Sequence, residues 1–295
     1  MADVFFGCFL PQVRTDWPRL RDRALAAEAA GFDSVWLMDH LATPADAALE
    51  TFEAWTAAAA LAVATTRIRI GHLVTCDAFR HPALLAKMAV TVDHCSAGRL
   101  EMGLGWGSVP EELDRYGYPA QAAAARAARL AETLEILDLM FAGEPFDFDG
   151  AHFRLRAALG RPRPLQRPRP PIHLGGAGPR RTLPLAAAHA DWWNCPSYAA
   201  DRFAELRPLA APARASIQRP VGLVGPGMDR GEVEAMARRR FGTWGGLVVG
   251  TPDEVAEVLA ADRRAGADGF VIQFHDFGTP ASMELFMAQV APRIG

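Results

Sequence analysis

The chain of 295 residues is half hydrophobic and 22% charged, with a formal net charge of −3, as in an ordinary globular protein. This balance argues against a nucleic-acid partner, and the longest apolar stretch, residues 52–65, is alanine-rich and shorter than the roughly 20 apolar residues of a membrane span. Four scattered cysteines without a C-x-x-C pair predict reduced thiols, with neither a disulfide framework nor a metal site.

From the first residues onward, apolar strand-like runs alternate with amphipathic helical runs. Residues 1–3 show no basic region or cleavage site of a secretory leader, so we expect a cytoplasmic protein. The strand-like runs lie at residues 4–10, 34–38, 68–75, 100–104, 172–174, 192–194, 221–224 and 270–274. The helical runs lie at residues 17–30, 52–64, 82–95, 123–141, 180–188 and 251–265. Such alternation is typical of β-α units around parallel strands, and the length suits one (β/α)8 barrel, so the sequence predicts a single TIM-type barrel domain over residues 1–295.

Two stretches interrupt this alternation. Residues 146–155 alternate like a small hairpin, with a type I′ turn expected at Asp149-Gly150. Residues 161–171 are rich in proline, which lacks the backbone donor and restricts the residue before it, so this stretch is expected to be an extended connector. We interpret the hairpin as an insertion into the barrel.

Polar side chains follow the second and third predicted strands, at the end of a barrel where function collects. Asp39 and His40 come directly after the second strand, and a histidine there can donate or accept a proton near neutral pH. The alternative is that Asp39 caps a loop and His40 packs on the barrel rim. His72 and His81 lack accompanying acids or a metal-ligand spacing, so we interpret them as packing residues.

Glycine-rich segments follow the fourth and fifth strands. Residues 103–108 approach the G-x-G-x-x-G fingerprint but carry Ser108 where glycine is required, which leaves a tight turn or a surface for a flat ring. Residues 175–178 form a second glycine-rich turn that opens into a helix, where exposed N–H groups and the helix dipole attract an anion. Arg180 and Arg181 add positive charge. This turn therefore predicts a phosphate site, made of Gly175, Gly176, Ala177 and Gly178.

Together, several segments resemble the luciferase-like flavin oxidoreductases over almost the whole chain. They are FLPQ at 9–12, GFDSVWLMDH at 31–40, RHPALLAK at 80–87, SAGRLEMGLG at 96–105, PIHLGGAG at 171–178 and GTPDEV at 250–255. The resemblance is strongest to the branch that uses the deazaflavin coenzyme F420. It implies a luciferase-like barrel with insertions, usually a homodimer, which places the cofactor's ring over the strand ends and its phosphate on the second glycine-rich turn.

The resemblance also implies roles for individual residues. Asp39 would contact the ring and His40 would face the reacting centre as the catalytic residue. The segment of Leu73, Val74 and Thr75 would form a bulge behind the ring, often with a non-prolyl cis peptide. The ring would also lie alongside Trp106 and Gly107.

The chain departs from this family pattern at Ser108, where some F420 dehydrogenases carry a catalytic glutamate. Glu111 and Glu112 follow one turn later as candidates for that role. A second departure, Trp106, replaces a smaller residue and is expected to narrow the pocket. Three functions stay open: F420-dependent oxidoreductase acting on a small molecule, FMN-dependent monooxygenase supplied by a separate flavin reductase, and flavin-binding protein without catalysis.

Overall fold

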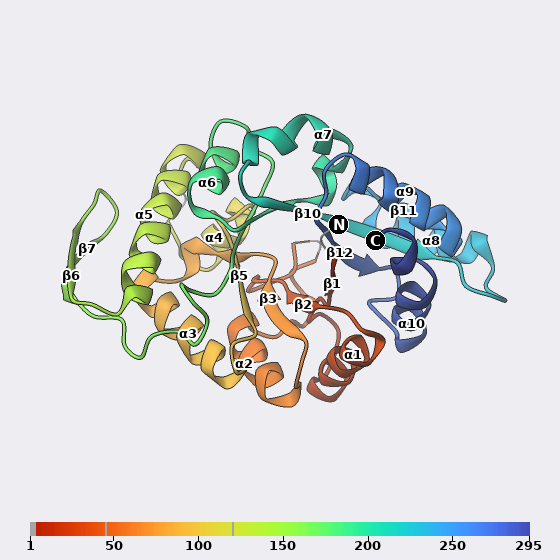
Figure 1. The fold of residues 1–295 in the computed structure, drawn as a ribbon, viewed down its shortest axis with the longest axis horizontal. Helices are drawn as coiled ribbons and strands as arrows, with labels where there is room; N and C mark the ends of the chain where they lie inside the picture. The colour runs from red at the N-terminus through yellow and green to blue at the C-terminus, as the bar shows by residue number, and fades with distance from the viewer. Residues whose placement is uncertain (1–3, 45, 120) are drawn as a thin grey trace.

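Eight parallel strands close into a barrel in this computed structural model, which describes residues 4–44, 46–119 and 121–295 (Figure 1). Neighbouring strands are hydrogen-bonded in the order β1, β2, β3, β5, β8, β9, β10 and β12, and β12 pairs with β1 again. These barrel strands are β1 (Phe5–Phe9), β2 (Ser34–Leu37), β3 (Arg69–His72), β5 (Leu100–Gly105), β8 (Ile172–Gly175), β9 (Trp192–Cys195), β10 (Arg214–Leu223) and β12 (Gly269–Phe274). The predicted TIM-type barrel is therefore confirmed. Residues 1–3, on which the expectation about a leader depends, lie outside the described residues.

Helices surround the barrel and bury one face each against the outward-facing strand residues (Figure 1). The helices are α1 (Trp17–Ala30), α2 (Ala54–Ala64), α3 (Pro82–Cys95), α4 (Pro110–Arg115), α5 (Ala123–Ala142), α6 (Thr182–His189), α7 (Phe203–Leu206), α8 (Arg230–Phe241), α9 (Pro252–Arg264) and α10 (Pro280–Gln289). Short 3-10 turns are η1 (Asp77–Phe79), η2 (Ser197–Arg202), η3 (Arg207–Ala210) and η4 (Ala291–Arg293). Helix α9 begins with a capping box, in which Thr251 and Glu254 bind each other's backbone N–H groups. No helix in the described ranges is both long and apolar enough to cross a bilayer.

Two of the predicted strands were wrong in extent. The run at residues 68–75 is divided into β3 and the short β4 (Thr75–Cys76), which pairs with β5. The run at 221–224 is only the end of β10, which begins at Arg214. Polar residues and Pro220 hide β10 in the sequence, because Ser216, Gln218 and Pro220 occupy alternate positions of the strand and interrupt its apolar pattern. The sequence analysis also missed β11 (Val248–Gly250), which extends the sheet beside β10.

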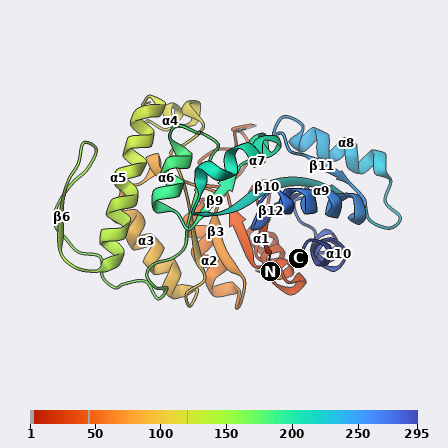
Figure 2. The ribbon, with the colours of Figure 1, turned by 45° about the horizontal axis from the view of Figure 1, so that its top comes forward.

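The predicted hairpin is confirmed as β6 (Phe146–Asp149) and β7 (Arg154–Ala158), and Figure 2 shows it projecting from the barrel beside α5. The predicted type I′ turn was wrong, because Asp149 pairs with Arg154 and the loop is therefore longer than two residues. The carboxylate of Glu132 on α5 accepts hydrogen bonds from three backbone N–H groups of this loop. A side chain from elsewhere in the sequence thus shapes the loop.

The proline-rich connector contains neither helix nor strand, as predicted, but it bends along residues 165–170 instead of running extended. It packs across the amino-terminal end of the barrel. Asp93 accepts hydrogen bonds from the backbone N–H of Leu165 and from the side chain of Gln166. Gln166 in turn accepts one from Arg69, which also forms an ion pair with the buried Glu101. Basic residues of the connector also have structural partners, since ion pairs join Arg163 to Glu144 and Arg169 to Asp138 and Asp191.

His72 faces outward from β3, fully buried, and stacks on Trp55 of α2 at 4.3 Å between ring centroids, as the packing interpretation expects. Burial lowers the pKa of His72 from 6.5 to about 4. The folded state disfavours the charged form of His72. The contribution of His72 to stability is therefore complete above pH 6.5 and is lost as the pH falls towards 4. Between pH 7.5 and 4.5 the free energy of unfolding of the native protein is expected to fall by about 2 to 3 kcal/mol more than that of the His72→Leu variant.

Urea unfolding at the two pH values measures this difference. The matched control is His94→Leu, which changes an exposed histidine on α3. The stability of this variant should show the same pH dependence as that of the native protein. An unchanged pH dependence in His72→Leu would contradict the assignment.

Candidate active site

His40 follows β2 at the carboxyl end of the barrel and is partly buried. Its Nδ1 atom lies 2.7 Å from Oε2 of Glu112, which comes from α4 after β5. The other carboxylate oxygen of Glu112 accepts the backbone N–H groups of Leu41 at 2.6 Å and Ala42 at 3.1 Å. Both oxygens are thus engaged, and one glutamate fixes both the imidazole and the loop that carries it.

Glu112 stays ionised in this arrangement. Burial acts to raise the pKa of its carboxyl group, but the hydrogen bonds from His40, Ala42 and Leu41 outweigh burial and hold the pKa below its usual value. An ionised carboxylate accepts only, so the proton of the shared hydrogen bond lies on Nδ1 of His40. Nε2 of the neutral ring is then the atom with a free lone pair. Of the two glutamates considered for the role left vacant at Ser108, Glu112 contacts His40, whereas Glu111 is exposed on α4.

Asp39 is buried next to the histidine but forms a different set of contacts. Its carboxylate receives two hydrogen bonds from Arg80, at 2.6 and 2.9 Å, and one from the backbone N–H of Cys76 at 2.8 Å. Arg80 also binds Glu53, which caps α2. These contacts tie the end of β2 to β4, to the segment between η1 and α3, and to the start of α2. A contact between Asp39 and a ring therefore stays a prediction, and the structure assigns its carboxylate first to Arg80.

A bulge separates β3 from β4 at Leu73 and Val74, as the family resemblance implies, and the peptide bond between them is cis. The side chain of Val74 lies against two glycines of neighbouring strands. A Cβ atom added to Gly105 or Gly175 would come within 2.6 or 2.7 Å of the Val74 methyl groups. Only glycines therefore allow Val74 to form the floor of the site. Thr75 is buried at the start of β4.

The segment after β5 places Trp106 and Gly107 beside this floor. Trp106 is partly buried and packs against the core, and Gly107 lies against the thiol of Cys76. Ser108 is exposed at the rim, before α4 begins. The serine therefore stands at the edge of the site, while the carboxylate near the histidine comes from Glu112.

The glycine turn connects β8 to α6, across the mouth from β1 and β12. Gly176 has φ of +131°, and a Cβ atom there would meet the Thr182 side chain at 3.1 Å, so the turn requires glycine at this position. The indole N–H of Trp193 donates to the Gly176 carbonyl at 2.8 Å. Burial raises the pKa of Tyr198, and the nearby backbone N–H of Ala177 acts to lower it. Tyr198 is a site residue that the sequence analysis missed.

Positive charge surrounds this turn, although the helix starts later than predicted. The first residue of α6 is Thr182, so Arg180 and Arg181 lie before the helix, and both are exposed. Within the described ranges neither arginine forms an ion pair. Backbone N–H groups, glycines and two free guanidinium groups together form a cradle suited to a phosphate.

Most of the residues predicted from sequence come together at the carboxyl ends of neighbouring strands β2, β4, β5 and β8. His81 caps α3 and contacts the ring of Phe153, as expected of a structural residue. In the described part of the chain, no group of three or more histidine, cysteine or acidic side chains is arranged to hold a metal ion.

Fold and site together define a TIM-type barrel protein with a polar, glycine-lined site at the carboxyl ends of its strands. The chain matches the family model of the luciferase-like monooxygenases over residues 5–230, and so belongs to that family.

Among curated relatives, the F420-dependent hydroxymycolic acid dehydrogenase of Mycobacterium tuberculosis is 32% identical over 216 residues, 72% of this chain and 58% of that protein. The chain spans less than two thirds of the length of the curated relatives that it matches. An F420-dependent secondary alcohol dehydrogenase bound to an F420-acetone adduct has a TM-score of 0.81 at 19% identity, covering 99% of each chain. The monooxygenase RslO1 from Streptomyces bottropensis has a TM-score of 0.80 at 22% identity, covering 99% of this chain and 100% of the other.

Proposed function

We propose that the protein is an F420-dependent oxidoreductase that moves a hydride between the deazaflavin ring and a small organic substrate. The observation that carries this proposal is the hydrogen bond between His40 and Glu112 at the mouth of a barrel whose opposite rim is a glycine-lined anion cradle. The names of the relatives, F420-dependent dehydrogenases among them, support the choice of cofactor.

In this proposal each segment of the mouth has a part in holding the cofactor. The phosphate would bind to the turn of Gly175, Gly176, Ala177 and Gly178, next to Arg180 and Arg181. Leu73, Val74 and Thr75 would support the ring from below, with Trp106, Gly107 and Asp39 alongside. When bound, F420 supplies a ring that accepts or donates a hydride.

The chain itself handles the proton. Because Glu112 fixes the Nδ1 proton of His40, Nε2 can take a proton from a substrate hydroxyl, or return it to a carbonyl, while the hydride moves. Glu112 acts through His40 and is a positioning residue. Val74 and the glycines around it exclude water from the floor, which strengthens electrostatic interactions at the site.

Titration of the purified apoprotein with F420 and, separately, with FMN tests the proposal. We expect saturable binding of F420, at least about tenfold tighter than that of FMN. In Gly176→Val, binding should weaken, because the added side chain meets Thr182 and φ is unsuited to valine, so the turn must change its shape. Tight binding of FMN alone would overturn the choice of F420.

The second candidate is an FMN-dependent monooxygenase, which the family model and the RslO1 structure favour by name. It would take reduced flavin from a separate reductase. Binding to FMN alone, with oxygen consumption when reduced FMN is supplied, would select it. Flavin binding without any turnover would select the non-catalytic alternative. Assembly as a homodimer and a cytoplasmic location stay predictions.

Replacing Glu112 by glutamine should lower kcat by about tenfold to a hundredfold and leave cofactor affinity unchanged, because the amide no longer fixes the tautomer of His40. Comparison of kcat, KM and cofactor affinity between the variant and the native protein measures this split. Glu111→Gln on the exposed face of α4 is the matched control. A fall in cofactor affinity as large as the fall in kcat would contradict a role confined to His40.

A further inference from the structure

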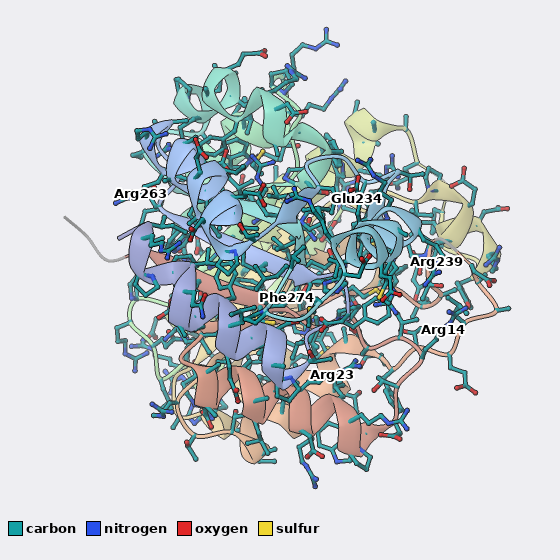
Figure 3. The ribbon with its side chains drawn as sticks, turned by 90° about the vertical axis from the view of Figure 1, so that its right-hand side faces the viewer. Arg14, Arg23, Glu234, Arg239, Arg263 and Phe274 are labelled. Atoms are coloured by element: carbon teal, nitrogen blue, oxygen red, sulfur yellow. The ribbon has the colours of Figure 1, made fainter. Side chains whose placement is uncertain are left out.

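Four arginines from distant parts of the sequence meet at one side of the barrel mouth. Arg14 follows β1, Arg23 lies on α1, and Arg239 and Arg240 end α8. Figure 3 shows Arg14, Arg23 and Arg239 on the same face of the molecule. All three contribute a positive charge that acts on Arg240. We call these four residues the arginine cluster.

Arg240 is the most constrained member of the cluster. Its guanidinium group donates to the carbonyl oxygen of His275, at the end of β12, and lies 4.1 Å from the ring centroid of Phe277. A cation held over an aromatic face keeps a fixed orientation. Burial lowers the pKa of Arg240, Asp276 raises it, and Arg239, Arg23 and Arg14 lower it again.

The charge of the cluster is compensated only in part, by Asp276, whose negative charge acts on Arg240. In the described part of the chain, none of the four arginines forms an ion pair, whereas Arg238, next to them on α8, pairs with Glu234 at 2.7 Å. Asp276 is the nearby carboxylate, but it is engaged at the start of α10. It accepts hydrogen bonds from Thr279 at 2.5 Å and Ser282 at 2.7 Å, as well as from the backbone N–H of Gly278.

The backbone at the cluster is constrained as well. Arg14 has φ of 49° and Phe277 has φ of 63°, in the left-handed region that residues other than glycine rarely adopt. Such conformations persist where the surroundings impose them, and they gather at ligand-binding and catalytic sites. Two of them on the loops that present the cluster point to a built site, since solvent-exposed arginines alone would require none.

The position of the cluster relates it to the proposed reaction. The loops after β1 and β12 carry Arg14 and Phe277, and β1 is the direct neighbour of β2, which leads to His40. The glycine turn follows β8, four strands from β1 in either direction round the barrel. A cofactor anchored on that turn therefore has its phosphate across the mouth, and the cluster lies on the side of His40.

We propose that the arginine cluster binds an anionic group of the substrate, a carboxylate or a phosphate, and so positions the reacting carbon near His40. The proposal rests on the proposed function for the identity of the reaction. Guanidinium groups bind both anions with paired, charge-assisted hydrogen bonds. The substrate class is then a small alcohol or carbonyl compound that carries a carboxylate or phosphate.

The test uses calorimetric titration of the F420-loaded protein with inorganic phosphate and with malonate at constant ionic strength. We expect saturable binding of at least one of these probes. Arg240→Gln and Arg14→Gln should each weaken it by about tenfold or more. The matched control is Arg238→Gln on the same helix, which removes the same charge outside the cluster and should change affinity by less than about twofold.

Each of the other possible results would contradict one part of the proposal. Non-saturable binding of both probes, or equal weakening by Arg238→Gln, would overturn the cluster as a site. In Arg240→Gln, the affinity for F420 could fall as much as the affinity for the anionic probe. That result would assign the cluster to the cofactor's acidic tail and overturn the substrate assignment. If the native protein binds neither F420 nor FMN, the proposed function fails. The same titration on apoprotein with the Gly176→Val substitution, which distorts the glycine turn, then tests the cluster alone.

Discussion

Replacement of His40 by alanine is expected to lower turnover by about a hundredfold to ten-thousandfold, the usual range for a lost general acid or base. Cofactor affinity should stay within about twofold of the native value, since His40 forms its hydrogen bond with Glu112 and not with the glycine turn. Steady-state turnover and direct titration with the cofactor, on the same preparations, measure the two quantities.

His94→Ala serves as the control for this variant, because it removes an exposed imidazole on α3 without touching the mouth of the barrel. Its turnover should equal that of the native protein. If His40→Ala turned over at the native rate, His40 would have no role in proton transfer. The hydrogen bond to Glu112 would then be a structural link between the loop after β2 and α4.

The barrel was predictable because most of its strands are short and apolar. The outward residues Val35 and Leu37 of β2 pack under the helices, and the runs around them are bounded by turn residues. Most of strand β10 was missed for the opposite reason, and only its last residues were predicted. Its inward residues are polar, and Gln218 contacts Gln273 within the barrel. These polar side chains find partners only in the closed sheet, so no local sequence pattern indicates the strand.

The site was predictable where it depends on position along a single strand. Asp39, His40 and the glycine turn all follow directly from the rule that function collects after the strands of a barrel. The hydrogen-bond partners of Asp39 and His40 were not predictable from the sequence. Arg80 lies 41 residues from Asp39, and Glu112 lies 72 residues from His40, so the pairings exist only once the strands are ordered.

Residues that act through the tertiary structure alone had no sequence signal. Tyr198 reaches the glycine turn from the segment after β9, although the two are adjacent only because β8 pairs with β9. The arginine cluster likewise combines α1 with α8. In a sequence where nearly every basic residue is arginine, four more arginines do not stand out.

Asp39→Ala is expected to reduce the free energy of unfolding by about 2 kcal/mol or more, because it leaves the buried Arg80 with the partly exposed Glu53 as its remaining ion-pair partner. Side chains of Asp39 and Arg80 are 2% and 9% exposed, so water cannot replace the lost contacts. Urea unfolding measures the loss. Asp22→Ala, which removes an exposed ion pair with Arg21 on α1, should change stability by less than about 1 kcal/mol.

The double variant Asp39→Ala/Arg80→Met separates the stranded charge from the lost contacts. Methionine fills much of the space of Arg80 without a charge, so the double variant should regain at least about 1 kcal/mol relative to Asp39→Ala. Recovery is expected to be partial, because the N–H of Cys76 still lacks the acceptor that Asp39 supplied. Glu53 keeps its hydrogen bonds to the start of α2, so loss of Arg80 does not strand it in turn. A double variant less stable than Asp39→Ala would show that Arg80 supports the fold independently of Asp39, and that the aspartate is available to a bound ring.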